Sequence, residues 1–156
     1  LFVLAPIFAL FAQAGPSPSK SKTEFGNEPI QVEKLLKEIK VNADQIRSYA
    51  LKPGTREQFD RIATQQAIPM LRRWEVDVVA HGPSPHDGDS YYLIRSYASL
   101  ADRQQSQDAF YGSQEWKDGP RAAILALIEN FTSVVLELEP ATVEALRSAP
   151  VGRAAA

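Results

Sequence analysis

One pentapeptide, Ile-Arg-Ser-Tyr-Ala, occurs twice in the chain, at residues 46–50 and again at residues 94–98. Each copy is followed by a stretch with the apolar spacing of a helix and then by a run rich in β-branched residues, at 76–82 and at 131–138. Two β-α-β units that open on the same sequence predict the ferredoxin-like plan. We therefore expect an α+β fold, ferredoxin-like βαββαβ, with a four-stranded antiparallel sheet and helices on one face.

Local signals predict where the helices begin and bend. Thr55 with Gln58 matches a capping box at the start of the first helix. Pro69 is expected to kink that helix, because proline lacks the N–H of the helical ladder. In the second half, Ser99 can cap a helix that has Asp102 in its first turn.

The composition excludes several kinds of protein. The 156 residues include 44% hydrophobic and 23% charged residues, which suits one domain with a real core and a tail. A net charge of −2 gives no global attraction to nucleic acid, so no nucleic-acid partner is expected. The chain has no cysteine. Disulfides, thiolate metal sites and a cysteine nucleophile are therefore excluded.

The two ends differ in character from the middle. Residues 1–14 are mostly apolar and end in Ala-Gln-Ala, the pattern of a signal peptide that has lost its start. We therefore expect an exported chain, periplasmic or secreted, with no stable membrane span once mature. Residues 15–40 predict a linker with a short amphipathic helix at 30–40. The compact domain is expected at 41–138, and residues 139–156 predict a short helix and a flexible tail.

Apolar residues occur on both faces of the expected strands. In the last strand, Phe131 and Val135 point one way, and Val134 and Leu136 point the other. A sheet with one wet face should alternate cleanly, and the helices cover only one face. A second copy of the sheet is the simplest cover for the other face, so the sequence predicts a homodimer.

Several segments carry a resemblance to a known family. The sequences YALKPG at 49–54, PMLRRW at 69–74 and DSYYLIR at 89–95 resemble the NIPSNAP domain. Residues 103–116 add the arrangement Ser-x-x-x-Phe-Tyr-x-Ser-x-x-Trp, which is characteristic of bacterial members. The resemblance implies the dimeric α/β-barrel superfamily, which also contains cofactor-independent monooxygenases and haem-degrading enzymes. It implies no catalytic constellation, because the family has no agreed one.

Matching positions in the two repeats suggest a binding patch. Arg47 and Tyr49 in the first copy correspond to Arg95 and Tyr97 in the second. We expect these two strands to lie side by side and to run parallel at the sheet's centre, which would place a pair of guanidinium groups inside the barrel. Such a pair suits an anionic or carbonyl-bearing ligand.

The alternative for these arginines is structural. Acids such as Glu137 or Asp77 would then pair with them in a buried polar ridge. Aromatic side chains add further candidates. Tyr92 lies on the second repeat strand, while Tyr111 and Trp116 either line the mouth of a cavity or anchor the ends of helices.

The histidines, His81 and His86, are followed by Asp87 and Asp89. Two histidines and two carboxylates suit zinc or non-haem iron. However, the prolines and Gly88 in this segment mark an ordinary turn that joins the two halves, so we predict no metal site. His81, at the end of a strand, is the better candidate for a base or a haem ligand.

These observations predict a NIPSNAP domain protein that binds a small, partly apolar ligand in the interior of a dimeric barrel, without a cofactor. The predicted ligand-binding residues are Arg47, Tyr49, His81, Tyr92, Arg95, Tyr97 and Trp116. Whether the protein is an enzyme stays open at this point. One alternative is activity like that of a cofactor-independent monooxygenase, which needs a dry pocket that deprotonates its substrate. Another is haem binding at His81.

Overall fold

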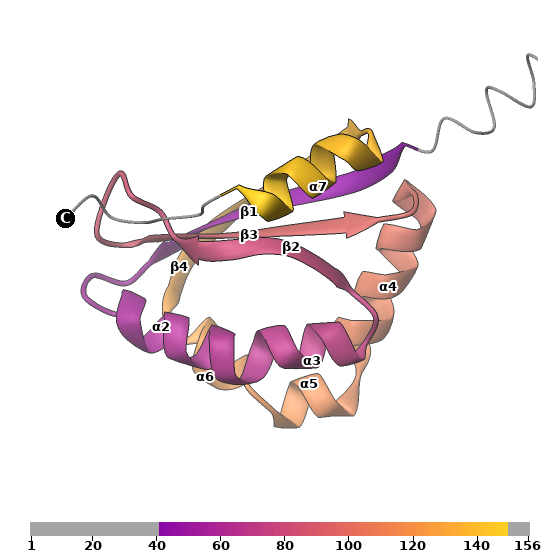
Figure 1. Ribbon diagram of the computed structural model, residues 1–156. Coiled ribbons are helices and arrows are strands. Elements are labelled where there is room, and N and C mark those ends of the chain that lie inside the picture. The colour runs from indigo at the N-terminus through magenta and orange to yellow at the C-terminus, as the bar shows by residue number, and fades with distance from the viewer. Residues whose placement is uncertain (1–40, 150–156) are drawn as a thin grey trace, which may run out of the picture.

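The structure is a computed structural model that describes residues 41–149 (Figure 1). The elements in chain order are β1 (Asn42–Leu51), α2 (Arg56–Ile62), the π-helix η1 (Ala63–Ala67), α3 (Ile68–Arg73), β2 (Asp77–Pro83), β3 (Ser90–Tyr97), α4 (Leu100–Gly112), α5 (Gln114–Asp118), α6 (Arg121–Leu125), β4 (Ile128–Leu138) and α7 (Pro140–Ser148). The predicted signal segment, the predicted linker with its amphipathic helix and the last part of the predicted tail lie outside the described residues.

The four strands form a single antiparallel sheet in the order β2-β3-β1-β4. This confirms the predicted α+β class and the βαββαβ order. The repeated pentapeptides lie side by side at the centre, with Ile46 opposite Ile94. The expectation that their strands run parallel is wrong. Each helical crossover joins two strands of the same direction, and β3 enters between β1 and β2 in the opposite direction.

Pro69 alters the first helical region without ending it. A π-helical turn, η1, precedes α3, and Pro69 occupies the first turn of α3. Because proline has no N–H, the carbonyl four residues earlier loses its α-helical partner, and a local widening of the helix accommodates this loss. The predicted kink is thus a π-helical turn.

The two predicted helix caps had different outcomes. Ser99 Oγ accepts a hydrogen bond from the backbone N–H of Asp102 at 3.1 Å, which confirms the cap of α4. Thr55 does not cap α2 with its side chain. Its hydroxyl donates instead to the backbone carbonyl of Lys52 at 2.7 Å, so the predicted capping box is wrong.

Helix α3 ends in a left-handed residue. Glu75 has a φ of 58°. Its N–H donates to the carbonyl of Arg72 at 3.0 Å, and the N–H of Val76 donates to the carbonyl of Leu71 at 3.0 Å. These two bonds define a Schellman motif, in which glycine usually takes the left-handed position.

One face of the sheet packs on helices α2 to α6, which lie on the same side of it (Figure 1). We call this the helix face. Its strand residues alternate with those of the other face, so Tyr49, Tyr91 and Leu93 point into the core. The most deeply buried apolar side chains there include Leu51, Phe59, Leu71, Tyr91 and Phe110.

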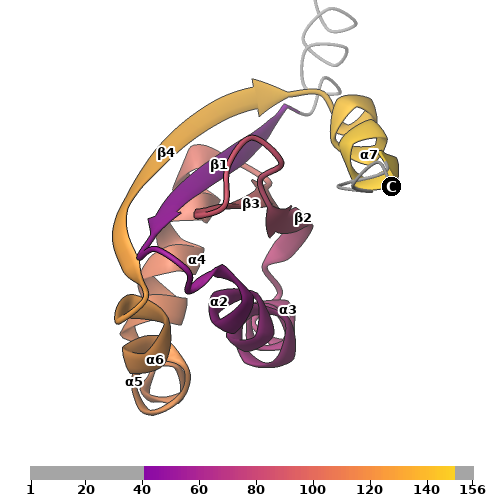
Figure 2. The same ribbon diagram turned by 90° about the vertical axis from the view of Figure 1, so that its left-hand side faces the viewer.

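The other face, which we call the open face, is covered only in part by residues 41–149. Helix α7 lies against it near β2 (Figure 2), with Val143 buried and Arg147 paired with Asp77 at 2.9 Å. Towards β4 the face stays apolar and exposed: Val134 is 54% and Leu136 39% accessible. Among residues 41–149, no helix has the length and apolar character needed to cross a bilayer.

Candidate functional site

Helix α4 faces the sheet with several polar side chains rather than with a wholly apolar face. Arg103, Gln107 and Tyr111 are spaced by four residues and therefore share one side of the helix. Opposite them, the helix face of the sheet presents polar residues from β1 and β3. We call this set the polar layer; it comprises Gln45, Arg47, Arg95, Tyr97, Arg103, Gln107 and Tyr111. Buried polar groups are more informative than exposed apolar ones, so the layer is the first candidate site.

Two guanidinium groups in the layer converge on one hydroxyl. Arg95 Nη1 donates to Tyr111 Oη at 3.0 Å, and Arg47 Nη1 donates to the same oxygen at 3.2 Å. Arg95 is fully buried. Arg47 also donates to Ser133 Oγ at 3.2 Å, and its guanidinium lies 4.7 Å from the centre of the Phe131 ring. Charge-assisted bonds of this kind hold the two cations side by side.

The surroundings favour the charged form of Arg47. Burial alone lowers the pKa of Arg47, but the neighbouring Tyr111 and Tyr49 outweigh burial and raise it. Burial raises the pKa of Tyr49, as does Tyr111, while Arg47 and Arg95 act to lower it. Tyr49 therefore stays a neutral phenol beside two cations at neutral pH.

Carboxylates do not neutralise these two arginines within the described part of the chain. The ion pairs found in residues 41–149 include neither Arg47 nor Arg95. Asp77 pairs with Arg147 instead. The alternative in which Glu137 or Asp77 balances the two arginines is therefore wrong for these residues. A buried cation without a counter-ion is unusual, because buried charges are normally paired.

A small apolar cavity adjoins the layer at Tyr111. It has a volume of about 40 Å³ and is lined by Tyr49, Phe59, Ala63, Ala67, Ile68, Leu71, Tyr91, Leu93, Phe110, Tyr111, Trp116 and Ile124. The π-helical turn η1 supplies the two small alanines. A water molecule needs about 10–15 Å³ on this measure, so the cavity holds only a few waters as it stands. It is far too small for haem, and no contact in it favours the haem hypothesis.

A hydrogen-bonded chain borders the same cavity. Tyr91 Oη donates to Asp60 Oδ1 at 2.7 Å and lies 3.0 Å from His81 Nδ1. Burial, followed by the bond to Asp60, raises the pKa of Tyr91 well above its usual range. Burial, followed by the charge of Arg72, lowers the pKa of His81, although Asp60 opposes this. His81 is therefore neutral at neutral pH. Because the Tyr91 hydroxyl donates to Asp60, His81 Nδ1 donates to Tyr91 Oη, and Nε2 is the nitrogen that can accept a proton.

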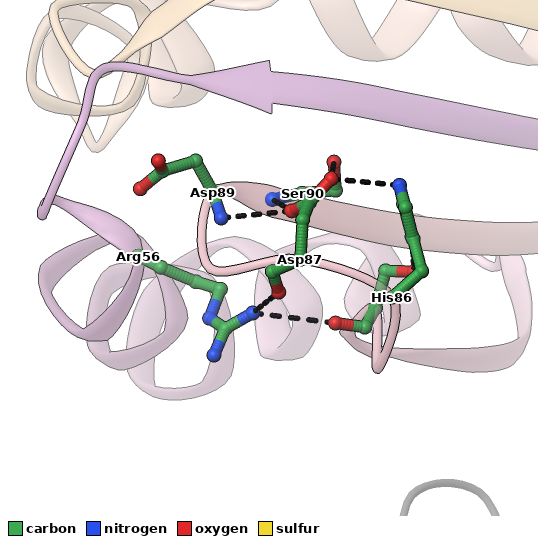
Figure 3. A network of polar contacts seen from close by, with 6 residues as sticks. Arg56, His86, Asp87, Asp89 and Ser90 are labelled. Carbon is green, nitrogen blue, oxygen red and sulfur yellow. Dashed lines mark hydrogen bonds and ion pairs between the residues drawn. The ribbon is translucent and has the colours of Figure 1, made fainter.

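His86 belongs to a different network, in the loop between β2 and β3 (Figure 3). Its Nδ1 lies 2.6 Å from Ser84 Oγ, and its Nε2 lies 2.7 Å from Asp87 Oδ2. Asp87 also accepts bonds from the backbone and hydroxyl of Ser90, and these lower its pKa. Arg56 of α2 ties the loop down through two backbone carbonyls. In the described residues no group of three histidines or acids could hold a metal ion, and these contacts fit a structural turn.

The structure separates the predicted ligand-binding residues into two groups. Arg47, Tyr49, His81, Arg95, Tyr97 and Trp116 lie on the helix face or in the core beneath it. Tyr92 points to the open face, where its hydroxyl packs near Gly82. The space that these residues surround is therefore between sheet and helices, and not between two sheets as expected.

Several residues of the site were not among the predicted ones. Gln45, Arg103 and Gln107 belong to the polar layer, and Asp60 completes the chain to His81. A signal for two of them existed in the sequence, since Arg103 and Gln107 are one helical turn apart and lead to Tyr111. Gln45 shares its strand face with Arg47 and Tyr49, two and four positions away.

Comparison with known proteins agrees with this architecture. The NIPSNAP family model matches residues 44–140, more than half of the chain. No curated protein matches it. A NIPSNAP family protein of unknown function from Agrobacterium tumefaciens strain C58 has 19% identity and a TM-score of 0.59, covering 65% of this chain and 90% of that one. A NIPSNAP-like domain protein from Burkholderia xenovorans has 17% identity and a TM-score of 0.59, covering 64% and 86%.

A second NIPSNAP family protein from the same Agrobacterium strain has 16% identity and a TM-score of 0.58, covering 64% of this chain and 87% of that one. At such identities these likenesses show a shared fold and nothing about a ligand. The family model matches from Asp44 in β1 to Pro140 at the start of α7, and so spans the whole sheet together with helices α2 to α6. The chain belongs to the NIPSNAP family.

Proposed function

We propose that this protein is a homodimeric binding protein for a small, partly apolar ligand that carries an anionic or carbonyl group. The observation that carries the proposal is the convergence of Arg47 and Arg95 on Tyr111 Oη, without a carboxylate partner among residues 41–149. Two such cations provide a strong site for an oxygen acceptor. The buried Arg95 and the half-buried Arg47 thus form a pair of guanidinium groups without a counter-ion among these residues.

The apolar part of the ligand would occupy the adjoining aromatic cavity. Its walls from Phe59, Phe110 and Trp116 suit a flat or short apolar group. Because the cavity is only about 40 Å³, binding requires it to widen. The side chain of Tyr111 would have to move, because its hydroxyl lies where the two arginines would hold the acceptor oxygen of the ligand. It sits at the end of α4, next to Gly112 and the break before α5.

Calorimetry with small aromatic carboxylates such as salicylate and phenylacetate tests this proposal. We expect binding to the whole chain, a loss of about tenfold in affinity in Arg47→Gln, and little binding in Ala63→Val, which narrows the cavity. Arg61→Gln, an exposed arginine on α2, is the matched control and should bind as the wild type does. Equal affinity in Arg47→Gln and the wild type would contradict the proposal, as would no binding by any member of the panel.

The dimer part of the proposal rests on the open face. Val134 and Leu136 are exposed there on β4, and Ile46 and Ile94 lie beside them at the centre of the sheet. Helix α7 covers this face only near β2. A second copy packed on the remaining area would remove this apolar surface from water.

A further inference from the structure

The polar layer contains buried donors that have no acceptor. Within the described residues, Arg95 Nε, Gln45 Nε2, Tyr97 Oη and Arg103 Nε are shielded from water and make no hydrogen bond. Arg95 and Gln45 are 0% accessible and Tyr97 is 5% accessible. We call these groups the donor cluster. Unsatisfied buried donors are rare in folded proteins, so several in one place need an explanation.

The members of the donor cluster are neighbours. Arg95 Nη2 donates to Gln45 Oε1 at 2.7 Å, and Gln107 Nε2 donates to the same oxygen at 2.7 Å. The Arg95 guanidinium lies 6.0 Å from the centre of the Tyr97 ring. Arg103 is one helical turn from Gln107 on the same side of α4. Gln45 Oε1 is thus already used twice, and no other acceptor of the layer, Gln107 Oε1 included, is placed to bond the remaining donors.

The protein itself offers no acceptor that could turn towards the cluster from β1. Asp44, whose carboxylate is also buried and unpartnered within residues 41–149, is the neighbour of Gln45 along the strand. Successive strand residues point to opposite faces, so Asp44 lies on the open face and cannot reach the donor cluster. What the cluster lacks is an acceptor-only group with several oxygens.

A groove beside the cluster gives such a group a way in. It has a volume of about 550 Å³ and is lined by residues that include Tyr97, Gln105 and Ser106. Its lining also includes the carboxylates of Glu75, Asp77 and Asp102; Asp77 pairs with Arg147, and Asp102 accepts a bond from the backbone N–H of Ala98. Tyr97 is the member of the donor cluster that lines the groove, so an anion would reach the guanidinium groups of Arg95 and Arg103 past this side chain.

We propose that the donor cluster is a binding site for a small oxyanion that enters from this groove. Oxygens of the anion would accept from Arg95 Nε, Arg103 Nε and the hydroxyl of Tyr97, with the amide of Gln45 as a fourth donor. This site shares Arg95 with the ligand site proposed above but uses other atoms of it and does not depend on that ligand. The oxyanion is either a free ion or the head group of an organic acid.

Calorimetry and thermal unfolding of the whole chain test the site with two probes, sodium sulfate and sodium benzoate, against sodium chloride at equal ionic strength. We expect sulfate to bind and to raise the unfolding temperature more than chloride does. Binding of benzoate alone, weakened by Tyr97→Phe but not by Arg47→Gln, would identify the oxyanion as a head group held at the donor cluster. Neither probe exceeding chloride would overturn the proposal.

Tyr97→Phe is the decisive variant, because the hydroxyl it removes has no partner within the described residues. If Tyr97 had only a structural role, Tyr97→Phe would have unchanged or higher stability and unchanged anion binding. The proposed site predicts the same stability without the anion but an affinity about tenfold weaker. Arg103→Gln should weaken binding likewise, whereas Arg121→Gln on α6 should not. Undiminished binding in Tyr97→Phe and Arg103→Gln would refute the site.

Discussion

Glu75 holds a backbone conformation that favours glycine, at the end of α3. With φ at 58° its Cβ crowds the backbone, although both bonds of the Schellman motif are made. We expect Glu75→Gly to raise the free energy of unfolding by about 1 kcal/mol, measured by urea denaturation. A loss of stability in Glu75→Gly would show that the glutamate side chain has a role that outweighs the strain.

Gly54 also has a positive φ, of 75°, with open space around it. Gly54→Ala should therefore lower the free energy of unfolding by about 1 kcal/mol, measured in the same way.

His81 gives the fold a dependence on pH. Its pKa is lowered in the folded protein, first by burial and then by Arg72, so the folded state binds fewer protons than the unfolded chain below the ordinary value of 6.5. Stability is therefore complete above that pH and falls as the pH drops towards the lowered folded pKa. We expect the wild type to lose more stability than His81→Gln between pH 7 and about pH 5.5. Denaturation at a series of pH values measures this, and parallel profiles for the two proteins would contradict it.

At the residue scale the sequence predicted much of the site but not its location. Arg47 and Arg95 were found because the repeat aligns them. The prediction that they face the interior of a dimeric barrel was wrong. Period-2 alternation tells which residues share a face of the sheet, but it does not say which face the helices cover. Arg103 and Gln107 were not predicted because polar residues on a helix usually face solvent. Gln45 was not predicted because it lies outside the repeated pentapeptide that aligned the two arginines.

Helix α4 begins at a serine cap. Ser99 Oγ accepts a hydrogen bond from the backbone N–H of Asp102 at 3.1 Å at the start of α4, the helix that carries Arg103, Gln107 and Tyr111 of the polar layer. We expect Ser99→Ala to cost about 1 kcal/mol of unfolding free energy, since a free N–H at the helix start then has no partner. Ser99→Asp keeps an acceptor and should stay near the wild type. Urea denaturation compares the three proteins, and equal losses in both variants would mean that the hydroxyl acts otherwise than as a cap.

Elements with strong local signals were predictable, and elements shaped by packing were not. The β-branched runs at 76–82 and 131–138 became β2 and the greater part of β4. Ile128 continues the apolar spacing of Ile124 in α6, yet it opens β4 because it pairs with Leu51; the extra residue at this irregularity, Glu129, lies in β4. The π-helical turn η1 was read as a kink. The missing N–H of Pro69 shows that the hydrogen bonds of the helix are disturbed. Whether the result is a kink or a π-helical turn depends on how Ala63 and Ala67 pack under the sheet.

At the scale of the molecule, residues 41–149 leave one sheet face partly uncovered, and this leads to a prediction about its mass. The chain of 17.2 kDa should scatter light as twice that mass. Leu136→Lys introduces a charge on the open face and should give a monomer, because the charge would be desolvated at the interface. Leu125 is exposed to a similar degree, 45% against 39%, but lies on α6 beneath the other face. Leu125→Lys should therefore stay dimeric. A wild-type protein that is monomeric at micromolar concentration would rule out the interface.

The order of the strands also determines when each strand can pair while the chain is being synthesised. Of the four strands, the central strand β1 is made first, and it can pair with β3 as soon as that strand follows, while β2 pairs with the other edge of β3. The other edge of β1 pairs with β4, the last of the four strands to be synthesised. Asn42 can therefore pair with Leu138 only after β4 has been made. Until that strand leaves the ribosome, β1 offers a row of free backbone donors and acceptors to any neighbouring nascent chain. The interval between the synthesis of β3 and β4 is therefore when this polypeptide is most vulnerable to wrong pairing and most in need of a chaperone.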